Sequence, residues 1–455
     1  MKPMSVDEIR AATRGLLVCG ARSFEVAGVS TDSRSIKPGD LFVALAGDKF
    51  DGHDYIRAAL EAGASGVIYS RDFPIYRSDS QKAFIKVPDT LQALGDMARG
   101  YRKSLKAAVV AVTGSNGKTT TKEMTRHLLE QKFQTVASPS SFNNFVGLPL
   151  TLFATESATR VVVLEMGTNH PGEIARLAEI AAPDVGLVTN VGRTHLEGLK
   201  SVEGVAAAKA ELLHALGPAG VAILNADDPA LMKMRSWLTV KVFTFGVENP
   251  ADVFARAIER TETGFSFSIN DAAKCRLNVP GRHNIYNALA AIAVCRRLGL
   301  DLEYIAQRLS EYRLPPMRLD ERASNGAVVI NDAYNANPES MSRAVEELSS
   351  RKAARRFFVF ADMLELGDES DALHRELGAK AAAAGFDFLW ATGSQARIAL
   401  DACLAAGVPA ARVRHFKDVD ELGRALAKEL AAGDVALVKG SRAMGLERAF
   451  KYLEH

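Results

Sequence analysis

One segment of the sequence combines residue types and spacing that suit phosphate chemistry: AVVAVTGSNGKTTTKEM, from Ala108. Gly114 and Gly117 leave room for a backbone to wrap around an anion, and they permit positive φ angles. Backbone N–H groups at the start of the following helix then converge on the phosphates. Lys118 adds positive charge for the β- and γ-phosphates, and Thr119 offers a hydroxyl to Mg²⁺. The segment therefore predicts a loop that binds ATP together with magnesium.

This loop is shorter than the common pattern G-x-x-x-x-G-K-[ST], because Val112 stands where that pattern has its first glycine. A Gly-Lys-Thr triplet alone occurs often by chance in loops. Here an apolar strand precedes the loop and a helical pattern follows it, which is the context that a phosphate loop requires. The expected nucleotide contacts from this loop are Gly114, Ser115, Asn116, Gly117, Lys118, Thr119 and Thr120.

Two further side chains follow strands that are expected to lie beside the loop. Glu165 ends the strand RVVVLEMG, and His195, in TNVGRTHLEGL, follows the next strand. The carboxyl ends of parallel strands gather ligands at one edge of a sheet, so both residues are candidate magnesium ligands. Taken singly, Glu165 also suits a turn cap and His195 a surface loop. Lys209, in VAAAKAELL, is on sequence alone a solvated lysine of a helix.

The elements that must position these residues form three blocks, so we predict an α/β fold of three domains. Residues 1–83 contain short strands, turns and a helix, typical of a small N-terminal α/β domain. In residues 84–313 apolar strands alternate with helical patterns, which predicts a parallel sheet covered on both faces, with an antiparallel appendage at 252–280. A Pro-Pro pair at 315–316 breaks helical continuation. Residues 314–455 alternate again and predict a Rossmann-like C-terminal domain.

The composition argues against some classes of partner and location, although a local basic patch is still possible. The 56 lysines and arginines nearly balance the 54 aspartates and glutamates, giving a net charge of +2, which argues against nucleic acid as a main partner. The four cysteines include no C-x-x-C pair and are typical of buried thiols in a reducing compartment. The start lacks an apolar signal-peptide core, and no stretch reaches the ~20 apolar residues of a membrane span. We expect a cytoplasmic monomer.

A set of motifs in fixed order carries a resemblance that covers almost the whole chain. The motifs are TGSNGKTTT, SFNNFVGLPLTL, EMGTNHPGEI, TNVGRTHLEGL, NADDP, GRHNIYNALAA, DAYNANPESM, ADMLELG and VKGSRAMGLE. The chain resembles the Mur ligase family, which builds the peptide stem of the bacterial cell wall, and it is most similar to the MurF type. That resemblance implies an ATP- and Mg²⁺-dependent ligase that joins D-alanyl-D-alanine to a UDP-linked muramoyl tripeptide, an enzyme of peptidoglycan synthesis.

The resemblance also implies roles for particular residues of the second and third blocks. Lys118, His195 and Lys209 would be catalytic, and Lys209 would gain a carboxylate by carbamylation. The implied metal ligands are Thr119, Glu165, His195 and carbamylated Lys209. Asn284 and Asn287 match positions near the adenine, whereas Arg318 and Asp332 match positions that reach the nucleotide when the domains close.

Two more groups of residues would bind the other substrates. The first block resembles the UDP-binding domain of related ligases, with Ser30, Thr31, Asp32, Ser33, Arg34, Asp51, Gly52 and His53 near the uridine diphosphate. Asp32 and Arg34 are equally suited to a local ion pair. On the side of D-alanyl-D-alanine we expect Tyr334, Asn335, Asn337, Lys439 and Ser441. Their segments, DAYNANP and KGSRAMG, also suit turns that begin helices.

The residues suit the implied reaction for physical reasons. A carboxylate resists attack by an amine until a phosphoryl group converts it into an acyl phosphate with a good leaving group. Donor and acceptor are both anions, so the site must supply concentrated positive charge. A closing third domain would exclude water from this intermediate.

Several alternatives remain open at this point. MurE-type ligases that add diaminopimelate carry D-N-P-R in the third block, which is absent here. Folylpolyglutamate synthases share the short loop but lack such a first block. A non-catalytic nucleotide switch or a small-molecule kinase would also use the loop, although the N-K-x-D signature of a guanine switch is absent. The sequence leaves open whether the third residue of the tripeptide is diaminopimelate or lysine.

Overall fold

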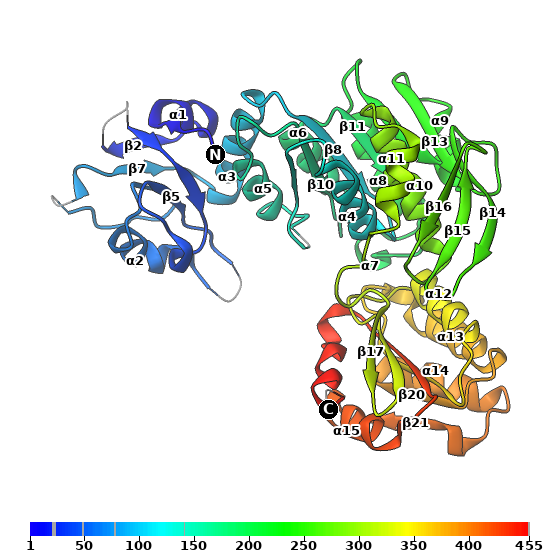
Figure 1. Ribbon diagram of the computed structural model, residues 1–455. Helices are drawn as coiled ribbons and strands as arrows, with labels where there is room; N and C mark the ends of the chain where they lie inside the picture. Colours follow the sequence, from blue (N-terminus) through cyan, green and yellow to red (C-terminus); the bar gives the residue numbers. More distant parts are fainter. Residues whose placement is uncertain (21–23, 48–49, 77–78, 141, 454–455) are drawn as a thin grey trace.

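The computed structural model describes residues 1–20, 24–47, 50–76, 79–140 and 142–453, and it contains three α/β domains. Figure 1 shows them as an angular arrangement, with the central domain at the corner and the first and third domains at its two ends. The predicted three-domain α/β fold is thus confirmed. Among the described residues, no helix is both long and apolar enough to cross a membrane.

The first domain is built on a five-stranded sheet of order β2-β7-β6-β5-β4. Its elements are β1 (Met4–Ser5), α1 (Val6–Thr13), β2 (Leu16–Cys19), β3 (Glu25–Val26), β4 (Gly28–Ser30), β5 (Asp40–Val43), α2 (Ile56–Glu61), β6 (Gly66–Tyr69) and β7 (Ala83–Lys86). Strand β7 pairs in parallel with β6. The predicted boundary between residues 83 and 84 therefore cuts this strand, and the first sheet extends to Lys86. The short apolar run AFIK gives no sign of which sheet it joins, which is why the boundary was misplaced.

The central domain carries a nine-stranded sheet of order β16-β15-β14-β13-β12-β11-β8-β10-β9. Its strands are β8 (Ala108–Thr113), β9 (Thr135–Ala137), β10 (Val161–Glu165), β11 (Val185–Val188), β12 (Val221–Asn225), β13 (Lys241–Gly246), β14 (Val253–Arg260), β15 (Phe265–Ile269) and β16 (Ala273–Leu277). The strands from β9 to β14 pair in parallel, and β14 to β16 form the expected antiparallel extension. Strand β8 lies between β10 and β11, so the sheet reverses its order of winding at this point.

The central sheet is covered on both faces, which explains its continuous apolar strands. Val110 and Val112 of β8 contribute to one hydrophobic core, whereas Val109 and Ala111 of the same strand contribute to another. The helices are α3 (Thr90–Lys103), α4 (Lys118–Leu129), α5 (Gly147–Phe153), α6 (Glu173–Ala181), α7 (Leu196–Leu199), α8 (Val202–His214), α9 (Pro229–Arg235), α10 (His283–Arg297) and α11 (Leu302–Leu309). The second core also contains Val6 and Ile9 of α1, so the first and central domains share buried apolar surface through α3.

The third domain has a six-stranded sheet of order β17-β18-β22-β19-β20-β21, in which β17 alone runs antiparallel to its neighbour. Its elements are β17 (Asp320–Ser324), β18 (Ala327–Asn331), α12 (Pro338–Ser349), β19 (Arg356–Ala361), α13 (Ser370–Ala383), β20 (Phe388–Thr392), α14 (Ser394–Ala405), β21 (Val413–Phe416), α15 (Val419–Glu429) and β22 (Val435–Lys439). The sequence after β22 predicts one last helix, but the structure has two 3₁₀ segments there, Arg442–Met444 and Leu446–Tyr452. The linker between α11 and β17 contains the Pro-Pro pair, and the proposed boundary at 313/314 falls within it.

Candidate active site

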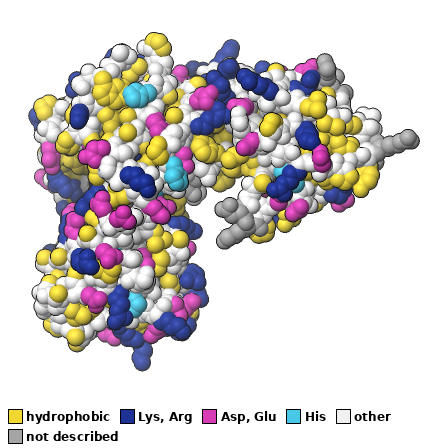
Figure 2. Space-filling view, turned by 180° about the vertical axis from the view of Figure 1, so that it is seen from behind, with side chains coloured by type: hydrophobic (Ala, Val, Ile, Leu, Met, Phe, Trp, Pro, Cys, Tyr) yellow, Lys and Arg dark blue, Asp and Glu magenta, His cyan; other side chains and the backbone are white. Residues whose placement is uncertain are grey.

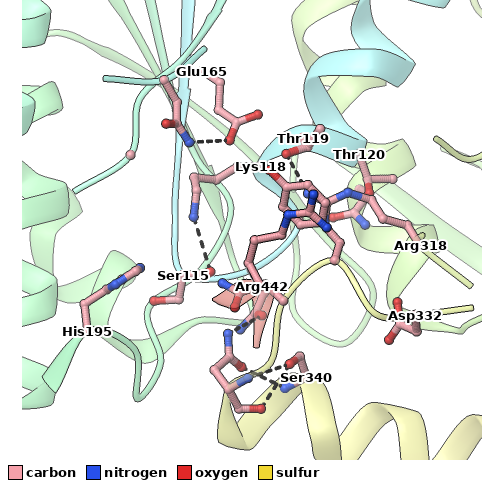
Figure 3. A pocket seen from close by; sticks show the side chains of 18 of the residues that line it. Ser115, Lys118, Thr119, Thr120, Glu165, His195, Arg318, Asp332, Ser340 and Arg442 are labelled. Atoms are coloured by element: carbon pink, nitrogen blue, oxygen red, sulfur yellow. Dashed lines mark hydrogen bonds between the residues drawn. The ribbon is translucent and has the colours of Figure 1, made fainter. Parts of the chain in front are cut away.

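A cavity of about 420 Å³ lies where the central and third domains meet, at the carboxyl edge of β8 and β10. In Figure 3, Lys118, Thr119 and Glu165 belong to the central domain, Arg318 to the linker before β17, and Asp332 to the third domain, directly after β18. Most of the predicted second- and third-block residues line this cavity: Ser115, Asn116, Gly117, Lys118, Thr119, Thr120, Glu165, His195, Asn284, Asn287, Arg318, Asp332, Tyr334, Asn335, Asn337 and Lys439. The sheet topology brings them together from distant parts of the sequence.

The glycines of the loop after β8 are required by its backbone and by close neighbours. Gly117, at the N-terminus of α4, has a φ of 83°, and a Cβ there would stand 2.2 Å from the amide oxygen of Asn287. Gly114 has a φ of 145°, and its Cβ would stand 1.9 Å from the hydroxyl of Thr189. The neighbouring loop supports the turn, because Asn116 N–H donates to the Asn190 side chain at 2.9 Å. The shape of the loop is therefore supported by hydrogen bonds and packing from neighbouring residues.

This loop concentrates positive charge at the start of α4. The first N–H groups of a helix have no intrahelical partner and form a site for anions. The ammonium of Lys118 donates to the Gly114 carbonyl at 2.7 Å, so it lies across the mouth of the loop. Loss of solvation lowers the pKa of Lys118, and an anion bound beside this ammonium would offset that loss. These features are typical of a phosphate site.

Glu165 is a buried carboxylate, and one of its two oxygens has no hydrogen-bond partner. Its side chain is 2 % exposed; Oε1 accepts from Asn143 Nδ2 at 2.9 Å, and its backbone N–H donates to Ser138 Oγ at 3.1 Å. The other oxygen, Oε2, is buried without a hydrogen-bond partner. An unpartnered buried carboxylate oxygen is energetically unfavourable unless a cation or donor reaches it. The cavity in front of it is the space from which a cation would come.

His195 lines the same cavity from the loop after β11. Its backbone is left-handed, with a φ of 54°, and its Nδ1 lies 2.6 Å from Oε2 of Glu365 in the third domain. The bond to His195 lowers the pKa of Glu365, so this carboxyl is ionised and accepts the Nδ1 proton. In the neutral ring the lone pair is then on Nε2, the nitrogen available to a metal.

Lys209 lies on α8 and does not belong to the cavity lining among the described residues. Its side chain is fully buried, and its Nζ has no hydrogen-bond partner. Burial, followed by the nearby charge of Lys118, lowers the pKa of Lys209 well below its ordinary value. A neutral buried amine is the form that reacts with CO₂ to give a carbamate. The sequence-only interpretation of Lys209 as a solvated lysine is therefore wrong.

The third-domain side of the cavity is tied to the phosphate loop by direct bonds. Arg318 Nη2 donates to Thr119 Oγ1 at 2.9 Å, and its guanidinium stacks 4.1 Å from the ring centroid of Tyr334. Asn337 donates from its side chain to Asn116 Oδ1 at 2.9 Å while its own Oδ1 caps α12. These bonds join the two domains across the site.

Asp332 and Lys439 form a buried ion pair at the ends of adjacent strands. Lys439 Nζ lies 2.6 Å from Asp332 Oδ2 and donates to the Asn335 carbonyl at 2.9 Å. The pair keeps Lys439 at the cavity wall. Ser441, by contrast, is buried and accepts from Leu364 N–H at 2.9 Å, and it is not among the lining residues. Of the two KGSRAMG residues expected beside the substrate, only Lys439 lies at the cavity.

Asn284 and Asn287 are buried and bonded to each other. Asn287 Nδ2 donates to Asn284 Oδ1 at 2.8 Å, its Oδ1 accepts from Thr121 Oγ1 at 3.3 Å, and Asn284 Nδ2 donates to the Pro280 carbonyl at 2.7 Å. These bonds join the start of α10 to the phosphate loop and α4. Both residues line the cavity, and the side chain of Asn287 packs against the turn at Gly117.

Sequence reasoning missed several lining residues. Asn143 holds Glu165, and Arg343 and Arg442 add positive charge to the cavity wall from the third domain. Asn143 and Arg442 fall inside motifs used for the resemblance, SFNNFVGLPLTL and VKGSRAMGLE, so a signal was present without an assigned role. Arg343 lies on α12 at a position that the sequence alone does not distinguish from other helical arginines.

The expected uridine diphosphate residues lie in the first domain, and none of them lines this cavity in the described part of the chain. Asp32 and Arg34 form the local ion pair that was the alternative interpretation, at 2.7 Å. His53 is buried, with Nδ1 2.6 Å from Asp51 Oδ1 and Nε2 accepting from Ser70 N–H at 3.0 Å. Ser30 ends β4, and Thr31, Ser33 and Gly52 lie in the two turns that contain Asp32 and Asp51. Figure 2 shows an open angle between the first and third domains.

The residues present fit a magnesium site of a particular kind. Among the residues that the structure describes, no three His, Cys, Asp or Glu side chains gather into a protein-only cage. Mg²⁺ is usually held by one or two carboxylates together with substrate phosphates, and it keeps several waters. The orphaned Oε2 of Glu165 and the orphaned Nζ of Lys209, once carbamylated, suit that pattern.

Figure 2 shows the charged side chains on one face of the molecule. Lysine and arginine side chains are interspersed there with aspartate and glutamate, which accords with the nearly equal numbers of basic and acidic residues in the sequence.

Family models match the chain along most of its length. The model "Mur ligase family, catalytic domain" matches residues 25–102, "Mur ligase middle domain" matches residues 112–295, and "Mur ligase, glutamate ligase domain" matches residues 317–442.

Individual relatives match nearly end to end. The UDP-N-acetylmuramoyl-tripeptide--D-alanyl-D-alanine ligase of Bacillus subtilis is 37% identical, over 94% of this chain and 93% of its own. The ligase of the same name from Escherichia coli is also 37% identical over the same shares. Crystal structure I of MurF from Acinetobacter baumannii superposes with a TM-score of 0.89 at 31% identity, covering 100% of this chain and 99% of that chain. The MurF ligase from Thermotoga maritima in complex with ADP gives 0.83 at 30% identity, covering 94% and 97%.

Proposed function

The chain belongs to the Mur ligase family, and on that premise we propose that its cavity catalyses the ATP-dependent joining of D-alanyl-D-alanine to UDP-N-acetylmuramoyl-tripeptide. The enzyme is an ATP-dependent ligase of peptidoglycan precursor synthesis, acting on small-molecule substrates. The observation that carries this conclusion is the phosphate loop with Lys118 beside a buried carboxylate, Glu165, at the meeting of two domains.

The reaction proceeds in two steps. The bond between the γ-phosphorus of ATP and its bridging oxygen breaks as a bond from the tripeptide carboxylate to that phosphorus forms, giving ADP and an acyl phosphate. The amine of D-alanyl-D-alanine then attacks the acyl carbon, phosphate leaves, and the nitrogen loses a proton. Both steps bring anions together, so positioning and charge stabilisation are the main tasks of the protein.

The residues of this chain supply those tasks. The N-terminus of α4 and Lys118 would hold the β- and γ-phosphates, and Arg318, 2.9 Å from Thr119 Oγ1, would approach them from the linker. Glu165, Thr119, His195 and carbamylated Lys209 are the residues that would hold Mg²⁺. Such an ion would neutralise the charge that develops on the transferring phosphoryl group.

We assign the remaining substrate contacts as follows. The first-domain turns around Asp32 and Asp51 would hold the uridine diphosphate, and the angle between the first and third domains leaves room for a substrate to extend toward the cavity. Tyr334, Asn335 and Lys439 would face D-alanyl-D-alanine. We also propose a cytoplasmic location, because all four cysteines are free thiols, as suits a reducing compartment. The monomeric state expected from the sequence stays a prediction.

A phosphate-release assay tests the proposed function. With ATP, Mg²⁺, UDP-muramoyl tripeptide and D-alanyl-D-alanine together, we expect release of free phosphate and formation of one product; omission of any one substrate should reduce phosphate release to background. Release of ADP without free phosphate, with one acceptor present, would identify a kinase. Nucleotide binding with no turnover under any combination would identify a switch. Comparing tripeptides that end in diaminopimelate or lysine would identify the third residue.

A further inference from the structure

The metal-facing loop of the central domain is in contact with a particular loop of the third domain. His195 and Glu365 approach each other across the domain boundary, with 2.6 Å between Nδ1 and Oε2. Glu197 N–H donates to the Glu365 carbonyl at 3.1 Å, so backbone and side chain of the same residue meet the same short turn. Gly367 packs against Glu197 as well. The contact is therefore a fitted junction of two loops.

The third-domain loop that carries Glu365 is held firmly on its own side. Met363 N–H donates to Nε2 of the buried His374 at 3.1 Å, and Leu364 N–H donates to Ser441 Oγ at 2.9 Å. The carboxylate of Asp362 accepts from Ala396 N–H at 2.7 Å, at the start of α14. Glu365 itself has a left-handed backbone, with a φ of 63°. Such conformations persist where the surrounding structure determines them, which indicates that the position of Glu365 is specified.

The central-domain turn, by contrast, obtains much of its support from the third domain. Leu196 and Leu199 of α7 are buried in the same hydrophobic cluster as Met363 and Leu366. Val205 and Ala208, on α8 directly before Lys209, belong to that cluster too. Two candidate metal ligands, His195 and Lys209, are thus next to residues that the third-domain core buries.

We propose that Glu365 is a positioning residue that fixes the His195 ring with Nε2 toward the cavity, so that the metal site is complete only when the third domain is docked. A carboxylate that accepts the second N–H of a metal-binding histidine sets its tautomer and orientation, and removal of such a partner weakens metal affinity about 10- to 100-fold. The inference rests on the proposed role of His195 as a metal ligand.

A simpler interpretation is that Glu365 only contributes an ion pair that holds the domains together. The structure offers a matched comparison, because Arg193, two residues before His195, pairs with Glu376 of the same third domain, with its guanidinium 2.8 Å from the carboxylate. Glu376 crosses the same boundary without touching a candidate metal ligand. Loss of Glu376 should therefore reproduce any effect that comes from docking alone.

The test measures binding of Mn²⁺, as a probe for Mg²⁺, to the full-length enzyme in the presence of ADP, by electron paramagnetic resonance of the free ion. For Glu365→Ala we expect the dissociation constant for Mn²⁺ to rise at least about tenfold. For Glu365→Gln the dissociation constant for Mn²⁺ should rise less, because the amide oxygen of glutamine still accepts a hydrogen bond from Nδ1–H of His195. Glu376→Ala, which removes only a partly exposed ion pair, should change this dissociation constant by no more than about fivefold. The Gln variant also keeps the test informative if the Ala variant folds poorly, which a thermal unfolding midpoint will reveal.

The outcomes separate the inference from the function on which it rests. If His195→Ala weakens Mn²⁺ binding and Glu365→Ala does not, the positioning role is wrong and the metal assignment stands. If Glu365→Ala and Glu376→Ala weaken binding equally, docking explains the effect and the positioning role is again wrong. If His195→Ala leaves Mn²⁺ binding unchanged, the metal assignment itself fails, and the inference fails with it.

Discussion

The loops that follow β8 and β11 end neighbouring parallel strands of one sheet, yet different parts of the molecule hold them in shape. The phosphate loop after β8 is held mainly within its own domain, through Asn190 and Asn287, with one bond from Asn337 of the third domain. The first part of the loop after β11 is bonded to the phosphate loop, but its end at His195 contacts the third domain, through Glu365 and a shared apolar cluster. The phosphate site therefore depends mostly on one domain, whereas the position of His195 depends on how two domains meet.

Lys118→Ala should give the largest effect, because it removes the one ammonium placed across the mouth of the phosphate loop. We expect kcat to fall at least about 10²- to 10³-fold, the range for loss of one preorganised charge-stabilising group. The fold should be unchanged, since this lysine bonds only to nearby carbonyls. Phosphate release and a thermal midpoint measure the two properties. Lys132→Ala, beyond the end of α4, is the matched control. Wild-type turnover in Lys118→Ala would contradict the assignment of this segment as the phosphate loop.

Gly117→Ala tests whether the loop is shaped within its own domain. A left-handed φ costs a residue with a Cβ about 1–2 kcal/mol, and here the added carbon also meets the Asn287 amide. We expect ADP affinity, measured by calorimetry, to fall about tenfold or more. A second substitution that shortens the side chain of Asn287 should restore part of the ADP affinity of the Gly117→Ala variant.

The control for this substitution is Gly172→Ala at the start of α6. That glycine has a similar φ of 87°, but nothing lies within 4 Å of a Cβ built on it. The Gly172→Ala variant should have a lower free energy of unfolding, because the Cβ strains the backbone, but it should bind ADP with the affinity of the parent enzyme. Equal ADP affinities for Gly117→Ala and the parent enzyme would contradict the close fit at the loop.

The next largest effects should come from substitutions of the candidate metal ligands. Glu165→Gln removes the charge of the orphaned oxygen but keeps an acceptor for Asn143, so we expect the Mg²⁺ concentration for half-maximal activity to rise about tenfold. His195→Ala should also raise it. Glu173→Gln is a control in the same cavity, because one Glu173 oxygen accepts from Thr168, Asn169 and His170 and serves a turn. An unchanged magnesium titration for both Glu165→Gln and His195→Ala would remove them from the metal shell.

The same contrast explains what the sequence could predict. The phosphate loop is local: an apolar strand, two glycines and a helix start are adjacent in the chain, so Lys118 was identified from its neighbours alone. The parallel edge that collects Glu165 and His195 follows from strand alternation and was also predictable. Glu365 lies in the motif ADMLELG, but its contact with His195 follows only from the packing of the third domain. Arg343 also reaches the cavity only through that packing, and its local sequence resembles that of an ordinary helix. The strand β7 was assigned to the wrong domain for a similar reason, since pairing partners are not local.

The smallest effect should come from Arg193→Ala, which removes the guanidinium that pairs with Glu376 and Glu339 across the domain boundary. These groups are partly exposed, and such pairs contribute about 0.2–1 kcal/mol, so Mn²⁺ affinity should change by no more than about fivefold. The pairs are screened by salt. Raising the ionic strength should therefore weaken Mn²⁺ binding in the parent enzyme and bring it close to the variant.

Acidity does not separate this ion pair from the fitted junction at Glu365, because the pKa of both carboxylates is lowered by their partners. The bond to Arg193 lowers the pKa of Glu376, so the contribution of the pair to docking is complete above the usual carboxyl pKa and is lost as the pH falls through the lowered one. At neutral pH the pair is fully charged, so the salt concentration, and not the pH, changes its strength. If Arg193→Ala weakens Mn²⁺ binding as strongly as Glu365→Ala, then charge across the boundary, and not the fit of two loops, determines how the third domain builds the metal-facing side of the site.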